Sequence, residues 1–162
     1  MSKSEPEQHT PLSTKIEEML TEARVVLPGA QALLGFQLVV TLTRAFETLP
    51  FTSRLVHAAA LVLVALAVIL LMAPAAFHRI AFRGEDTEDF HRIGSWFVVA
   101  ATVPLAAGIA GDVYVAVGKI AETQVLGIAA ALAVLIVLIA LWYAQPYLLR
   151  RKLAAQHAAR RG

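Results

Sequence analysis

The sequence predicts an all-α, polytopic membrane protein, a bundle of four transmembrane helices with an amphipathic N-terminal flank and a basic C-terminal flank. Of its 162 residues, 58% are hydrophobic and only 16% are charged, and the mean hydropathy is +0.66. A soluble domain is usually about 45–50% apolar and about 25% charged. The apolar residues gather in four stretches that approach the roughly 20 residues a helix needs to cross a bilayer.

The four predicted spans cover approximately residues 25–43, 55–77, 93–118 and 123–145. Charged side chains lie at the ends of these stretches, because a charge at the bilayer centre costs roughly 2.5–3.5 kcal/mol. Because the runs are continuously apolar, they indicate helices; the strands of a membrane barrel alternate and are only about 10 residues long. Together with their connections they predict a transmembrane domain over residues 25–149.

Three flanking segments are predicted around this domain. Residues 1–11 are polar, contain two prolines and are expected to be disordered. Residues 12–24 are expected to form an amphipathic interfacial helix, with Ile16, Met19 and Ala23 on its apolar face. The alternative is one continuous helix through Pro28, because transmembrane helices tolerate proline. Residues 146–162 form a basic tail.

The distribution of Lys and Arg predicts the orientation. Eleven lie in the N-terminal segment, the 78–92 loop and the C-terminal tail, whereas three lie in the other two connections: Arg44, Arg54 and Lys119. The positive-inside rule therefore places both termini in the cytoplasm. The tail residues Arg150, Arg151 and Lys152 are expected to face anionic phospholipid head groups, so that lipid and not nucleic acid is their predicted partner.

Asp112 is the one acidic residue inside a predicted span, and it lies about 9 Å from the end at Gly118 for a rise of about 1.5 Å per residue. His57 lies at nearly the same depth in the second span. If these two helices are neighbours, the pair is a candidate proton or ion site, since histidine titrates near neutral pH. The alternative is structural: Asp112 snorkels or pairs with Lys119, and His57 is simply solvated.

Two segments resemble a known family: EARVVLPGAQALLGF over residues 22–36 and APAAFHRIAFR over residues 73–83. They are similar to small bacterial integral membrane proteins known only as a domain of unknown function. The resemblance implies four helices and the bacterial inner membrane, and it implies no activity. Seven residues carry it, and we expect them to meet in one cluster at the inner ends of the first two spans, termed here the inner-mouth cluster: Arg24, Pro28, Gly29, Gln31, Pro74, His78 and Arg79.

Two readings of this cluster stay open. Arg24 and Arg79 are suited to binding a lipid phosphate or a partner carboxylate. The positive-inside rule explains both arginines equally well, although it does not explain the Pro-Gly-x-Gln segment.

The sequence contains no nucleophile–base pair and no metal-ligand spacing, so we expect no enzyme, no cofactor and no metal. The acids of the 78–92 loop are explained by capping of the third span at Asp86 or Thr87. The favoured interpretation is a non-enzymatic structural or accessory protein, either homo-oligomeric or bound to a partner membrane protein. The alternative is a small oligomeric proton or monovalent-cation channel or transporter that uses Asp112. Small residues are expected at its helix contacts: Gly108, Gly111, Gly127 and Ala131.

Overall fold

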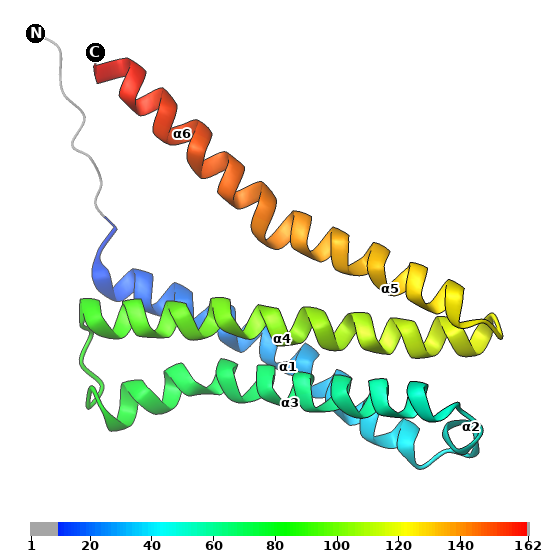
Figure 1. Ribbon diagram of the computed structural model, residues 1–162. Helices are drawn as coiled ribbons and strands as arrows, with labels where there is room; N and C mark the ends of the chain where they lie inside the picture. Colours follow the sequence, from blue (N-terminus) through cyan, green and yellow to red (C-terminus); the bar gives the residue numbers. More distant parts are fainter. Residues whose placement is uncertain (1–9, 162) are drawn as a thin grey trace, which may run out of the picture. The chain divides into compact units, whose positions relative to one another are not determined.

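The computed structural model describes residues 10–161, which contain helices and connections and no strand (Figure 1). The predicted disordered tail at residues 1–11 therefore lies almost wholly outside the described residues. The elements in chain order are α1 (Leu12–Thr41), α2 (Arg44–Glu47), α3 (Phe51–Ile80), α4 (Glu88–Ile120), α5 (Gln124–Ile139), the π-helix η1 (Ala140–Ala144) and α6 (Gln145–Arg161).

Four helices of the described chain are long and apolar enough to cross a membrane. Three of them are α1, α3 and α4, and the fourth runs through α5, η1 and α6 over Gln124–Ala159. The predicted class, an all-α protein with four candidate transmembrane helices, is confirmed. A helix pairs most of its backbone groups within itself, as a segment in hydrocarbon requires. Pro28, Pro74 and Pro104 each remove one such N–H donor from α1, α3 and α4.

Helix α1 continues through Pro28, so the amphipathic flank and the first span form one helix. Its buried residues Ile16, Ala23, Ala30 and Gln37 recur every seven positions, with Met19 beside them. Residues seven apart lie nearly above one another on a helix of 3.6 residues per turn. One narrow stripe of α1 therefore packs, and the other faces are open.

The chain divides into two compact units, and α1, α3 and α4 each contribute to both. The first unit holds the chain up to Leu38 together with Val64–Leu105. Its core is built by Ile16, Met19 and Phe90, and partly buried apolar residues surround it: Leu12, Leu20, Phe82 and Val98. The apolar face of residues 12–24, predicted to lie at a lipid interface, thus packs against the start of α4.

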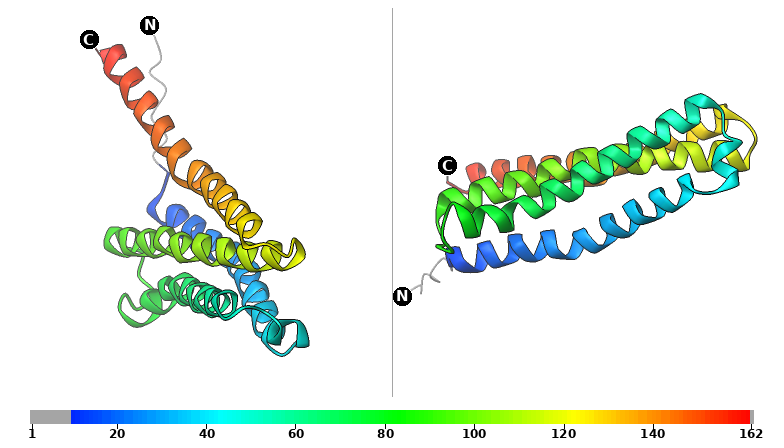
Figure 2. Two further views of the ribbon diagram at one scale, coloured as in Figure 1. Left: turned by 45° about the vertical axis from the view of Figure 1, so that its right-hand side comes forward. Right: turned by 90° about the horizontal axis from the view of Figure 1, so that it is seen from below.

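The second unit holds Val39–Leu63 and Ala106–Gly162. Here α3 and α4 approach closely at Gly111, where an added Cβ would lie 3.0 Å from Cβ of Ala60. At Gly127 of α5, an added Cβ would lie 2.6 Å from the carbonyl oxygen of Tyr114 in α4. Gly111 and Gly127 therefore mediate helix contacts inside the chain. Beyond this point α5, η1 and α6 continue as one long helical rod (Figure 2).

Candidate functional site

The second unit brings His57 of α3 and Asp112 of α4 together. The distance from Nδ1 of His57 to Oδ1 of Asp112 is 3.4 Å, and the two side chains are 5% and 21% exposed. His57 lies on the buried face of α3 that also carries Ser53 and Ala60, at the i, i+4, i+7 spacing of a packed helix face. Asp112 follows Gly111, the residue that lets the two helices approach.

Neighbouring residues enclose this pair on the side of α2. The ring of Phe46 meets the imidazole of His57 edge to face, with centroids 5.4 Å apart. Lys119, the alternative partner considered for Asp112, donates instead from Nζ to Oγ1 of Thr48 over 3.0 Å. Imidazole and carboxylate are complementary groups, and pairing offsets the cost of placing a charge in an apolar surrounding. The arrangement places a histidine and an acid from two helices side by side in a largely buried position.

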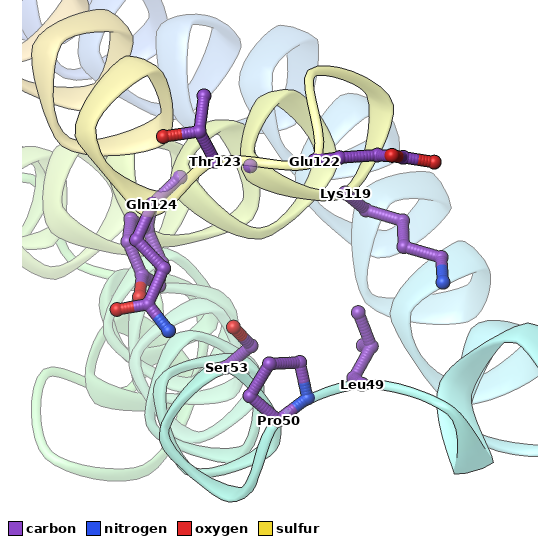
Figure 3. Close-up of a pocket in the computed structure, with 9 residues that line it drawn as sticks. Leu49, Pro50, Ser53, Lys119, Glu122, Thr123 and Gln124 are labelled. Atoms are coloured by element: carbon purple, nitrogen blue, oxygen red, sulfur yellow. The ribbon is translucent and has the colours of Figure 1, made fainter.

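A pocket of about 320 Å³ lies one helical turn from His57, because Ser53 lines it at the i−4 position (Figure 3). Its wall is formed by the α2–α3 connection and the start of α3, the end of α4, and the α4–α5 connection: Leu49, Pro50, Ser53, Tyr114, Gly118, Lys119, Glu122, Thr123 and Gln124. Sequence analysis missed this pocket. The two connections that build it are some 70 positions apart, and no pattern in either one points to the other.

The structure leaves the α1 part of the inner-mouth cluster at the surface. Its four members on α1 are all exposed: Arg24, Pro28, Gly29 and Gln31. They miss the packed stripe of α1, since Gln31 follows Ala30 by one position and therefore points about 100° away from it. Within residues 10–161, no ion pair involves Arg24 or Arg79. Pro74 is buried in α3, whereas Arg79 is exposed.

His78, the remaining member, contacts the start of α4. Its ring lies 4.7 Å from that of Phe90, and its Nε2 is 3.5 Å from Oδ1 of Asp86. This contact connects the end of α3 to the loop before α4. His78 therefore packs against Phe90, part of the first unit's core.

The basic tail lies along α6, where Arg150, Arg151 and Lys152 are exposed. The guanidinium of Arg151 sits over the ring of Tyr147, 5.6 Å from its centroid. Such a cation–π contact stiffens the side chain without removing its charge from the surface. The three residues are therefore available to a partner of negative charge.

Comparison with known proteins adds one positive result. The model of a family of unknown function (DUF6328) matches residues 6–146, which include both segments that carry the resemblance. The resemblance to a domain of unknown function is thereby confirmed. A search of curated proteins and a search of solved structures gave no significant match.

Proposed function

The chain belongs to the family of unknown function DUF6328, and on this premise we propose that it is a non-enzymatic, structural or accessory protein of the bacterial inner membrane. The observation that carries the proposal is the openness of the fourth span. In its most apolar window 6% of residues are buried, compared with 33% in α3 and 39% in α4. A helix so weakly held by its own chain is suited to packing against a partner membrane protein.

The same proposal assigns an orientation. Both termini lie in the cytoplasm, and the exposed Arg150, Arg151 and Lys152 of α6 contact anionic head groups of the inner leaflet. These contacts hold the first turns of α6 at the level of the head groups, so that α5 stands in the bilayer where a partner helix reaches it.

Affinity purification of the full chain from native membranes in a mild detergent tests this role, with native mass spectrometry as the readout. We expect a stoichiometric partner membrane protein. The double variant Leu132→Ala/Ile136→Ala, on one exposed face of α5, should lose most of that partner. The matched control Val62→Ala/Ile69→Ala, exposed on α3, should keep it. A chain that purifies alone as a monomer contradicts the structural or accessory role, and a chain that purifies only with further copies of itself contradicts a separate partner protein.

A second candidate function is favoured by the His57–Asp112 pair: movement of protons or monovalent cations. An ionisable pair inside spans marks an ion or proton site in many membrane proteins. Liposomes that contain the purified chain and a pH-sensitive dye test it under imposed proton, Na⁺ and K⁺ gradients. This function requires an ion flux that is lost in Asp112→Asn. The flux should persist in the control Asp89→Asn, because Asp89 is an exposed acid outside the pair. Flux no higher than in empty liposomes rejects it.

A further inference from the structure

We propose that the pocket lined by Ser53, Lys119 and Glu122 binds a small zwitterion with a phosphate and an ammonium group, supplied by the head group of a phosphatidylethanolamine lipid. This ligand site goes beyond the proposed accessory function and does not depend on it. The pocket, of about 320 Å³, is near the lower end of the about 300–1,000 Å³ typical of small-molecule sites, a size that suits a head group without its acyl chains.

One part of the pocket is suited to an anion. Lys119 reaches its edge, and the hydrogen bond to Thr48 holds the ammonium in place at 3.0 Å. Ser53 is 7% exposed, and its hydroxyl is directed to the space where the side-chain amide of Gln124 also lies (Figure 3). Ser53 and Gln124 offer an O–H and an N–H donor on one side of the pocket, and Lys119 adds a cationic N–H donor at its edge. Donors of this kind suit a phosphate with several acceptor oxygens.

The start of α5 adds to this anionic subsite. Thr123 is the N-cap residue of α5, but its side chain makes no capping hydrogen bond. The first-turn N–H groups of this 16-residue helix therefore receive no acceptor from the side chain of Thr123, and Thr123 and Gln124 both line the pocket. Backbone N–H groups at a helix N-terminus favour phosphate. The buried Ser53 hydroxyl, from a different helix, faces the same space.

A carboxylate at the same rim supplies the complement for an ammonium group. Glu122 has a φ of 52°, a left-handed backbone conformation that is uncommon for a residue other than glycine. This conformation ends α4 and turns the chain toward α5, which places Glu122 on the pocket wall three residues after Lys119. The pocket rim therefore carries one positive and one negative charge, the pattern that matches a zwitterion.

The position of the pocket favours a lipid as the source of this group. It lies where α3 begins and α4 ends, beside Arg54 and Lys119, and charged residues at the ends of apolar helices mark the head-group region. Leu49 and Pro50 give it an apolar side for the glycerol carbons. Free phosphoethanolamine shares the chemistry of the head group and lacks the anchor, so the two sources are separable by experiment.

Calorimetric titration of the full chain in detergent measures the affinity directly. The probes are short-chain phosphatidylethanolamine, phosphatidylcholine, phosphatidylglycerol and free phosphoethanolamine. Phosphatidylcholine keeps the positive charge without N–H donors, and phosphatidylglycerol has no ammonium. We expect phosphatidylethanolamine to bind about tenfold more tightly than either lipid, the gain that one charge-assisted hydrogen bond provides. Equal affinity for all three lipids overturns the proposal.

Variants locate the site. Lys119→Gln and Glu122→Gln should each weaken phosphatidylethanolamine about tenfold, whereas the controls Lys152→Gln and Glu47→Gln, which lie outside the pocket, should not. Ser53→Ala removes one donor with little change in volume and should weaken binding in a chain that folds normally by circular dichroism. Unchanged affinity in all three pocket variants overturns the assignment of the site. Free phosphoethanolamine that binds as tightly as the lipid overturns the lipid as its source.

Discussion

Gly127 is the residue on which the contact between α5 and α4 depends. Any side chain there would overlap the carbonyl oxygen of Tyr114, at 2.6 Å, and the backbone of Gly118, at 3.1 Å. Both neighbours belong to the backbone of α4, so no side chain can rotate away to make room. Small residues serve this purpose widely where membrane helices cross. Gly29 of α1 differs, because an added Cβ there would meet nothing within 4 Å.

Gly127→Ala should therefore destabilise the folded chain by about 1–3 kcal/mol, the usual cost of overpacking. Gly29→Ala should leave stability unchanged or raise it by up to about 1 kcal/mol, because alanine loses less backbone entropy in a helix. Thermal or denaturant unfolding in detergent, followed by circular dichroism, compares the two. Equal effects of the two substitutions would contradict the close approach of α5 and α4.

At the scale of the element, α4 and α5 begin in different ways. Thr87 caps α4: its Oγ1 accepts a hydrogen bond from N–H of Phe90 at 3.1 Å, and Glu88 and Asp89 occupy the first turn. This confirms one of the two residues expected as the cap. Negative charges there also complement the positive end of the helix dipole. Thr123 precedes α5 without a side-chain capping bond, although it is the same residue type.

The two threonines form a matched pair for substitution. Thr87→Ala should cost about 1 kcal/mol of stability, because one first-turn N–H of α4 loses its acceptor. Thr123→Ala should cost only a few tenths of that, because no side-chain cap is lost. The free energies of unfolding of both variants, measured in the same detergent, show which threonine caps its helix. A larger loss for Thr123→Ala than for Thr87→Ala would show that the capping is misassigned.

The π-helix η1 is explained by the residues next to it in the sequence. N–H of Gln145 bonds to the carbonyl oxygen of Ala140, five residues back, and Pro146 follows directly. Proline has no N–H, so it cannot serve the carbonyl four residues before it. The wider π-turn lets the helix pass this point without a break. The apolar α5 and the basic α6 therefore remain one continuous rod.

At the scale of the whole molecule, the orientation proposed from Lys and Arg makes a prediction that the lack of cysteine makes easy to test. A single Glu122→Cys should react with a membrane-impermeant maleimide on intact cells whose outer membrane has been permeabilised. A single Gln156→Cys in α6 should react only after the inner membrane is opened. The reverse pattern would place both termini outside and would contradict the positive-inside assignment.

Much of the fold can be predicted from the properties of each local segment of the sequence. The four spans, their charged boundaries and the cap at Thr87 depend on transfer cost and local hydrogen bonding, which each segment expresses alone. Membership in the family was likewise visible in two short segments, at residues 22–36 and 73–83. The similar depth of His57 and Asp112 in their spans could also be predicted, because depth follows from counting residues along a helix.

Only the folded chain decides which side of each helix packs and which helices are neighbours. Almost every side of a span is apolar, so hydropathy does not mark which side packs. The structure turns Ile16, Ala23 and Ala30 inward and leaves Arg24 and Pro28 exposed. It also makes α3 and α4 neighbours at Gly111, which joins His57 to Asp112 and brings two distant connections together as a pocket. These features depend on contacts between segments far apart in sequence, and such contacts form only when packing selects one arrangement.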